Sequence, residues 1–254
     1  MPTQPRSAIS PTLAPLRPMY ACPTTPAPEP PSTASLIRTL RLQPHIEGGY
    51  FAETDRDPLR VPNPFLARSP SPTLQTARPA GKDGDATRSA STSIFYLLTK
   101  ERPLGAWHRN RGRTVHTLHW GRGRYVVIHA DEVGEGGVEG GKARVETFVV
   151  GRNVEKGERL QWVVEGGKYK ASFLLGEEEE EEEEDEDEED EGKGSERGLL
   201  ISETVVPGFE YSDHDFLRPD RLRELVTPEQ AEELAWMLRS GPPPEEHELE
   251  YKNR

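Results

Sequence analysis

Histidines gather in one part of the chain and are the first candidates for chemistry. Four of the seven lie between residues 108 and 129: His108, His116, His119 and His129. An imidazole can bind a metal ion or exchange a proton near neutral pH. If residues 113–120 form a strand, their side chains alternate between two faces. His116 then shares a face with Thr114, while His119 points the other way. This parity argues against a three-histidine metal site and leaves His108 and His116 as partners in one site.

Polar and aromatic side chains elsewhere could complete a pocket around these two histidines, because small-ligand sites combine apolar walls with a few polar groups. The candidate ligand-binding residues are Tyr50, Glu53, His108, Thr114, His116, Gln161, Tyr169, Lys170, Ser172, Phe209 and Tyr211. Three of them, His108, His116 and Tyr50, are candidate catalytic residues, since a histidine base and a tyrosine acid can move a proton. A structural role is the alternative for each, and we expect it for His119 and His129.

The elements that must position these residues are predicted to be short β-strands. An alternating segment at 47–54 comes first, and glycine-containing turns separate the later strands. Such a pattern is typical of a sandwich or barrel, and without strand–helix–strand alternation it excludes a dinucleotide-binding fold. The later strands are predicted at 91–99, 104–109, 113–120, 123–131, 143–151, 158–164, 168–175 and 198–211.

Two short helices are predicted beside the strands. Ser35 begins the first, which ends before Pro44, and Thr227 begins the second, which Gly241 ends. The predicted organisation is a disordered proline-rich tail (1–34), a β domain (35–226) with a long loop (57–88) and a disordered acidic insertion (177–197), a C-terminal helix (227–240) and a tail (241–254).

The charge of the chain is concentrated in one run. The 254 residues include 32 basic and 45 acidic side chains, and fifteen consecutive acids occupy 177–191. Without that run the chain is almost neutral, which argues against a nucleic-acid binder. We interpret the run as a solvated spacer in a hairpin loop, with docking to a basic protein partner as the alternative.

Other features bear on the compartment. No apolar run approaches the roughly 20 residues of a membrane-spanning helix, and the N-terminus lacks the apolar core of a secretion signal. Cys22 is the single cysteine, which excludes an internal disulfide. We therefore predict a cytoplasmic or nuclear protein without a membrane partner. Arg6 and Arg17, with no acid before Glu29, leave organelle targeting as an alternative, against which the many prolines argue.

Four stretches resemble one known family. They read LQPHIEGGYFAET, STSIFYLLT, GAWHRNRGRTVHTLHWG and ETVVPGFEYSDHDFL. They are similar to the cupin superfamily and, within it, to the cupin-5 group of small, mostly uncharacterised proteins, over about residues 35–217. The resemblance implies an all-β jelly roll, a double-stranded β-helix barrel with short flanking helices. It also implies a pocket inside the barrel and, in most members, a homodimer.

The resemblance also implies positions for metal ligands, and this chain departs from them. Cupins usually place two histidines, a glutamate and a later histidine around a metal. His108 matches the second histidine, but Ala106 stands at the first, Thr114 at the glutamate and Tyr169 near the last. His116 could add a second ligand, but two imidazoles alone would bind an ion weakly. We therefore predict no metal and no other cofactor.

The sequence thus predicts a metal-free cupin that binds a small polar or sugar-like molecule inside its barrel. An enzyme is the first alternative, because the chain resembles metal-free cupins related to the dTDP-sugar 3,5-epimerases, which use a histidine base and a tyrosine acid. Such an enzyme would be an isomerase or epimerase rather than a metal-dependent dioxygenase. A protein-interaction module acting through the acidic run is the second alternative.

Overall fold

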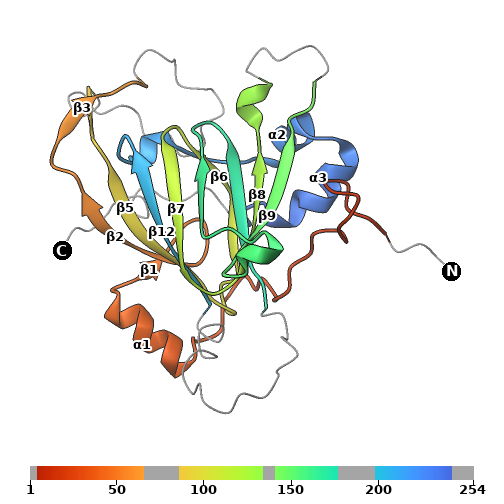
Figure 1. Ribbon diagram of the computed structural model, residues 1–254, viewed down its shortest axis with the longest axis horizontal. Helices are drawn as coiled ribbons and strands as arrows, with labels where there is room; N and C mark the ends of the chain where they lie inside the picture. The colour runs from red at the N-terminus through yellow and green to blue at the C-terminus, as the bar shows by residue number, and fades with distance from the viewer. Residues whose placement is uncertain (1–4, 66–85, 134–140, 177–197, 242–254) are drawn as a thin grey trace.

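The computed structural model describes residues 5–65, 86–133, 141–176 and 198–241. Two antiparallel sheets face each other, and a small two-stranded ribbon lies beside them (Figure 1). The six-stranded sheet has the order β1 (Gln43–Pro44), β2 (Tyr50–Arg56), β5 (Thr92–Leu98), β12 (Leu199–Val206), β7 (Arg113–Trp120) and β10 (Gln161–Val164). The five-stranded sheet has the order β13 (His214–Phe216), β6 (Leu104–Asn110), β11 (Tyr169–Leu174), β8 (Gly123–Ile128) and β9 (Val145–Val150). The ribbon pairs β3 (Arg60–Pro62) with β4 (Thr87–Ser89).

Apolar residues on the facing surfaces of the two sheets form the core of the barrel. Phe51 and Tyr96 of the six-stranded sheet belong to the same buried cluster as Tyr125 and Val127 of the five-stranded sheet. Side chains alternate along each strand, so the outward residues need separate cover. Outward residues of β2 and β5 are buried in this way, whereas those of β7 and β10 are partly or fully exposed.

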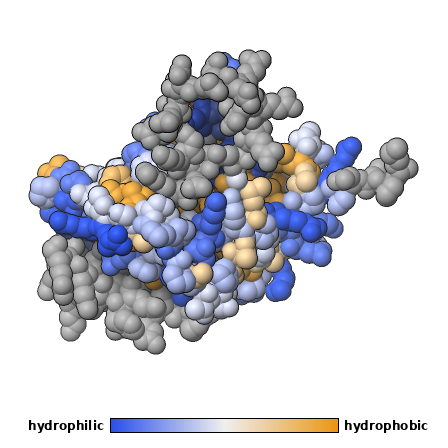
Figure 2. All heavy atoms as spheres, turned by 90° about the horizontal axis from the view of Figure 1, so that it is seen from below, coloured by the Kyte–Doolittle hydropathy of each residue, from blue (hydrophilic) through white to orange (hydrophobic). Residues whose placement is uncertain are grey.

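Helices cover part of each outer face. α1 (Pro31–Thr39) packs against the six-stranded sheet, where Tyr50 and Leu97 are buried. α2 (Pro219–Leu225), α3 (Pro228–Leu234) and the 3-10 turn η5 (Ala235–Met237) cover Trp107 and Tyr169 of the five-stranded sheet. Apolar side chains reach the face seen in Figure 2 in small groups among hydrophilic ones.

The prediction of an all-β jelly roll is confirmed, with differences at particular elements. The segment 198–211 is not one strand, because β12 ends at Val206 and the chain turns before β13. β11 and β12 belong to different sheets, so the acidic insertion between them does not join hairpin partners. The insertion itself and residues 66–85 of the loop 57–88 lie outside the described residues.

Helix boundaries also differ from the prediction. α1 begins at Pro31 rather than Ser35, because a proline suits the first turn of a helix. Thr227 does cap α3, in a capping box with Gln230, but the regular helix ends at Leu234 and η5 follows it. α2 was not anticipated. No helix in the described ranges is long and apolar enough to span a membrane.

The proline-rich N-terminal segment packs on the domain over residues 5–30, although its composition predicts disorder. The Glu233 carboxylate on α3 accepts hydrogen bonds from the Ser7 hydroxyl at 2.8 Å and from the backbone N–H groups of Ala8 and Leu16 at 2.7 Å each. The Trp236 indole donates to the Leu16 carbonyl at 3.2 Å. The Glu233 carboxylate thus attaches residues 7–16 to α3, although the prolines prevent regular secondary structure in this segment.

Replacement of Glu233 by alanine should release this segment. Loss of a hydrogen bond to a charged group costs roughly 1.5 kcal/mol, which corresponds to about tenfold faster amide exchange at Ala8 and Leu16. Hydrogen–deuterium exchange with peptide mass spectrometry measures it. The neighbouring, exposed Glu232→Ala is the control, and equal exchange in both variants would show that Glu233 does not hold the segment.

Candidate functional site

A buried lysine links the two sheets through the interior of the barrel. Lys170 of β11 donates hydrogen bonds from Nζ to the Glu203 carboxylate on β12 and to His116 Nε2 on β7, the latter at 2.8 Å. His116 and Glu203 lie directly opposite each other on neighbouring strands. Because the lysine donates, His116 Nε2 is an acceptor and the imidazole is neutral.

Burial and the lysine set the ionisation of these groups. Burial lowers the pKa of His116, and the Lys170 ammonium lowers it further. Burial alone would raise the pKa of Glu203, but attraction to the Lys170 ammonium, and to His116 when that ring is protonated, more than offsets this and leaves that pKa lowered. The group is therefore a buried ion pair with a neutral imidazole beside it.

Three imidazoles surround a second buried carboxylate, that of Glu47. His214 Nε2 lies 2.8 Å from Oε1, while His108 Nε2 and His45 Nδ1 each lie 3.3 Å from Oε2. Burial would raise the pKa of Glu47, but the positive charge that His108 and then His45 carry when protonated, together with the hydrogen bonds from His214 and His45, holds that pKa well below its usual range. The rings of His108 and His214 stack with centroids 5.4 Å apart. Glu47 is thus an ionised group whose environment is made almost entirely of histidine.

The orientation of His108 is fixed by the backbone. Its Nδ1 lies 2.8 Å from the carbonyl oxygen of Ala106, which can only accept, so Nδ1 carries the proton. Burial lowers the pKa of His108 to about 3. The ring is therefore neutral at physiological pH, and its Nε2 presents a lone pair toward Glu47.

Two glycines explain how Glu47 reaches this position. Gly48 and Gly49 have φ angles of +112° and +64°, which are strained for other residues. A Cβ at Gly48 would lie 2.0 Å from the Leu104 carbonyl oxygen, and one at Gly49 would lie 2.5 Å from that of Leu97. The turn between β1 and β2 can therefore lie against β6 and β5 and direct Glu47 inward.

The two groups form one site, which we call the inner cluster: His45, Glu47, His108, His116, Lys170, Glu203 and His214. Lys170 lies directly opposite His108 in the pairing of β11 with β6. After burial, the charges of Glu47 and Lys170 are the largest influences on the pKa of His108. Two nearby hydroxyls, of Tyr96 and Tyr125, have pKa values raised well above normal by burial and by the Glu47 and Glu203 carboxylates.

Several sequence-predicted residues do lie together here. His108, His116 and Lys170 belong to the inner cluster, and Thr114 and Ser172 are buried on the same strand faces as His116 and Lys170. The rings of Phe209 and Tyr211 lie beside the cluster, with centroids 6.2 Å and 6.5 Å from that of His214.

The structure separates three other predicted residues from the inner cluster. Tyr50 lies on the outer face of its sheet with Leu97, and its hydroxyl donates to Glu29. Tyr169 lies on the outer face of the other sheet and donates to Asp215, while Gln161 is exposed. Alternation along each strand directs their neighbours, such as Lys170, inward instead. Tyr50 is therefore not placed to act with His108.

Four members of the inner cluster were missed by the sequence analysis. Glu47 and His45 precede the two glycines, and His214 follows the last predicted strand. Glu203 had a detectable signal, because it is the one charged residue at alternate positions with Ile201 and Val205, both buried. Glu47 and His45 come from a turn and His214 begins a three-residue strand, and alternation does not identify residues in segments this short.

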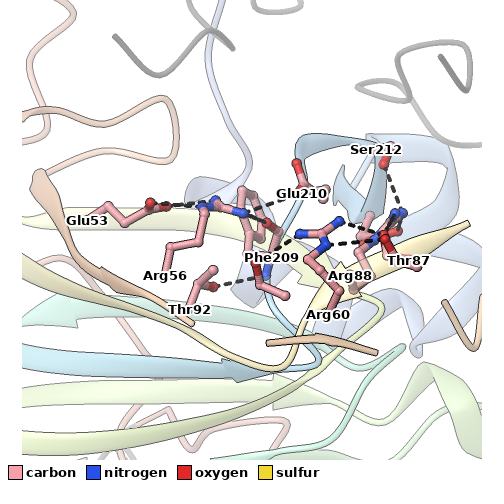
Figure 3. Close-up of polar contacts among 11 residues, drawn as sticks. Glu53, Arg56, Arg60, Thr87, Arg88, Thr92, Phe209, Glu210 and Ser212 are labelled. Carbon is pink, nitrogen blue, oxygen red and sulfur yellow. Dashed lines mark hydrogen bonds and ion pairs between the residues drawn. The ribbon is translucent and has the colours of Figure 1, made fainter. Parts of the chain in front are cut away.

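Arginines of β2 and β4 form polar contacts with the segment that precedes His214, and Figure 3 shows their contacts with Phe209, Glu210 and Ser212. Arg56 of β2 donates to the Glu53 carboxylate at 2.8 Å, to that of Glu210 at 3.1 Å and to the Phe209 carbonyl at 3.4 Å. Arg88 of β4 forms a buried ion pair with Asp213 at 3.1 Å. The predicted site residue Glu53 is therefore paired with Arg56 and is not part of the inner cluster.

The residues at the ligand positions of metal-binding cupins do not fit a metal. The carbonyl of Ala106 is bonded to His108, and Tyr169 lies on an outer face. The imidazoles of His45, His108 and His214 lie against the Glu47 carboxylate, and that of His116 lies against Lys170. Over the ranges that the structure describes, no group of three or more His, Cys, Asp and Glu side chains is arranged to hold a metal ion.

Comparison with known proteins identifies similar chains. The family described as Cupin superfamily (DUF985) matches residues 34–217. The uncharacterized protein YML079W of Saccharomyces cerevisiae is 40% identical over 218 residues, which cover 84% of this chain and 89% of that one. A hypothetical protein from Leishmania major has a solved structure with a TM-score of 0.58 and 26% identity, covering 82% of this chain and 98% of that one. Protein SO0799 from Shewanella oneidensis, with a TM-score of 0.53, 19% identity and coverage of 82% and 97%, shares the fold.

The lowered pKa values predict that stability falls on acidification. In the unfolded chain His108 and His116 titrate near 6.5, so below that value the unfolded chain binds protons that the folded chain does not. His108→Asn should reduce the loss of unfolding free energy between pH 7 and pH 5 by about 2 kcal/mol. Urea denaturation at both pH values measures it. The exposed His119→Asn should keep the wild-type pH dependence, and an unchanged dependence in His108→Asn would contradict a neutral His108.

Removal of the lysine charge should destabilise the barrel strongly. Lys170→Met leaves the Glu203 carboxylate buried without its cation, at a cost of about 3–5 kcal/mol. The double variant Lys170→Met/Glu203→Leu should recover most of this loss, because an apolar pair of similar volume removes the uncompensated charge. Denaturant unfolding of both variants measures the difference. A double variant no more stable than the single one would show that the ion pair is not what Lys170 contributes.

Proposed function

We propose that the barrel of this chain, which belongs to the Cupin superfamily (DUF985) family, binds a small, polar, sugar-like molecule at the inner cluster. Buried polar groups are costly, and proteins concentrate such costs at functional sites. Seven ionisable side chains meet here in an otherwise apolar interior. No metal or other cofactor is part of the proposal.

The observation that carries the proposal is a pair of acceptors that face each other. His108 Nε2 and Glu47 Oε2 lie 3.3 Å apart, and the proton of His108 is on the opposite side of its ring. Two lone pairs at this distance repel each other unless a hydrogen lies between or beside them. A hydroxyl group of a ligand supplies such a hydrogen to either atom, so the arrangement favours a ligand rich in donors.

Two further polar atoms support a ligand of this kind. The Asn110 side-chain oxygen and the Trp162 indole nitrogen are buried and have no hydrogen-bond partner in the described part of the chain. Asn110 lies directly opposite His214, and the Trp162 ring stacks on His116 with centroids 5.0 Å apart. Each such atom costs roughly 1–3 kcal/mol, which a ligand with donors and acceptors would recover.

The charges favour a neutral ligand over an anion. Glu47 and Glu203 place two carboxylates in the interior against the one ammonium of Lys170, and burial keeps His108 neutral. A carboxylate or phosphate would meet this excess of negative charge in a poorly screened environment. A sugar or another polyol offers hydroxyl donors without that repulsion.

Proton transfer of the isomerase or epimerase type is a second candidate. It is favoured by a neutral, oriented His108 whose pKa is strongly displaced and which lies beside a carboxylate, as in many proton-transfer sites. Tyr50 is not available as the acid, so that role would pass to Tyr211 beside the inner cluster or to Tyr96 inside. Transfer would require the same ligand pose, so both candidates share one binding test.

Binding can be tested before the ligand is identified. Native mass spectrometry of freshly purified protein should show a co-purified small molecule, and a panel of neutral monosaccharides and polyols should include compounds that raise the melting temperature. Glu47→Gln should weaken binding about tenfold or more, because it removes a charged acceptor worth roughly 1.5–3 kcal/mol. Circular dichroism confirms that the variant is folded.

The control is Gln161→Ala, a change on the exposed surface that should leave affinity unchanged. Incubation of the complex in deuterated water distinguishes binding alone from proton transfer. Replacement of a carbon-bound hydrogen of the ligand by deuterium would support proton transfer. Absence of both a bound molecule and a thermal shift, or equal affinity in Glu47→Gln and Gln161→Ala, would refute binding at the inner cluster.

A further inference from the structure

The inner cluster is almost completely enclosed. His214, Lys170 and His108 are 0%, 3% and 5% exposed. A ligand of several heavy atoms therefore reaches the site that we propose only if part of the protein moves. The route of access is then the part of the protein around the cluster whose displacement costs the least free energy.

The end of the barrel away from Arg56 is the more costly part. Leu98 and Leu199 are buried there in the apolar core, and Tyr20 of the N-terminal segment packs against the same cluster. Exposure of these side chains would cost about 25 cal/mol for every Å² of apolar surface. That end is therefore an unfavourable route.

The segment Phe209–Ser212 is the less costly part. Its Phe209 and Tyr211 rings are half-buried and lie against His214. Firm attachments flank it, since the Gly208 N–H donates to the Ser89 carbonyl at 2.8 Å and Asp213 forms a buried ion pair with Arg88. The segment is thus fixed at both ends, and its middle depends on other contacts.

The Phe209 N–H donates to the Thr92 hydroxyl at 2.9 Å, and Arg88 donates to the Ser212 hydroxyl at 3.5 Å, so these contacts hold the ends of the segment. Between them, Arg56 forms an ion pair with Glu210 and donates to the Phe209 carbonyl (Figure 3). The Arg56 and Glu210 side chains are 30% and 40% exposed, whereas those of Arg88 and Asp213 are 3% and 4% exposed. Exposed ion pairs contribute little to stability, so this attachment opens at low cost while the buried one stays closed.

We propose that Phe209–Ser212 is a gate over the inner cluster and that the Arg56–Glu210 ion pair is its catch. Opening of the catch lets the segment swing between Gly208 and Asp213 and exposes His214 first and His108 next. The gate regulates access to the inner cluster, so this inference rests on the proposed function. The motion of the gate can nevertheless be measured without a ligand.

Chemical modification by diethyl pyrocarbonate reports the motion, because the reagent acylates imidazoles that solvent reaches. Rates at each histidine are read by peptide mass spectrometry. Glu210→Ala should raise the rates at His214 and His108 about two- to fivefold, the range expected from loss of an exposed ion pair. The exposed His119 serves as the internal reference, with an unchanged rate. Phe209→Ala, which removes one ring of the gate, should also accelerate both histidines.

The matched control is Glu224→Ala, which breaks the partly exposed Arg221–Glu224 ion pair on α2. It should leave all three rates unchanged. High salt should raise the modification rates of His214 and His108 in the wild-type protein toward those of Glu210→Ala. It should have little effect on the rates in that variant. Unchanged rates at His214 and His108 in Glu210→Ala, or equal acceleration in Glu224→Ala, would overturn the gate. If a ligand binds but the modification rates of Glu210→Ala are unchanged, the gate alone is refuted. If these rates rise but no ligand binds, the proposed function alone is refuted.

Discussion

The buried ammonium of Lys170 is the constraint on which the interior depends. An ammonium in an apolar barrel requires a carboxylate, and Glu203 provides it from the opposite sheet. These residues lie on β11 and β12, which are separated in the chain by the acidic run. Their ion pair thus joins the two sheets through the interior of the barrel. A buried charged pair also needs further hydrogen-bond partners, so the residues around it in the centre of the barrel are polar.

The inner cluster joins two kinds of structure. Lys170, His116 and Glu203 stand on paired strands, where neighbouring strands fix their positions. Glu47 comes from a turn that two glycines permit, and His214 begins a short strand directly after Asp213. Rigid strands therefore set the electrostatics of the site, while irregular segments complete it and cover it. A preorganised site with a movable cover is what binding of a small molecule in a closed barrel requires.

Alternation in the sequence predicted which residues share a face but not which face is inside. Tyr50 and Phe51 are both buried, as are Tyr169 and Lys170, because helices cover the outer faces of the sheets at Tyr50 and at Tyr169. Hydrophobicity alone therefore does not distinguish the barrel interior from the helix-covered side. The strands, and the grouping of His116 with Thr114, follow from period-two patterns. Glu47 and His214 depend on turn geometry and long-range topology, which local patterns do not encode.

The gate and the ionisation of the inner cluster are physically connected. The segment Phe209–Ser212 is followed at once by Asp213 and His214, and His214 donates to Glu47 at 2.8 Å. Any displacement of the gate bears first on this hydrogen bond, which helps to keep Glu47 ionised in a buried place. Glu47 would then need another hydrogen-bond donor, such as a ligand hydroxyl, because His108 Nε2 carries no hydrogen. When the barrel opens, Glu47 thus loses the hydrogen bond from His214. The same opening lets a ligand with hydrogen-bond donors reach Glu47.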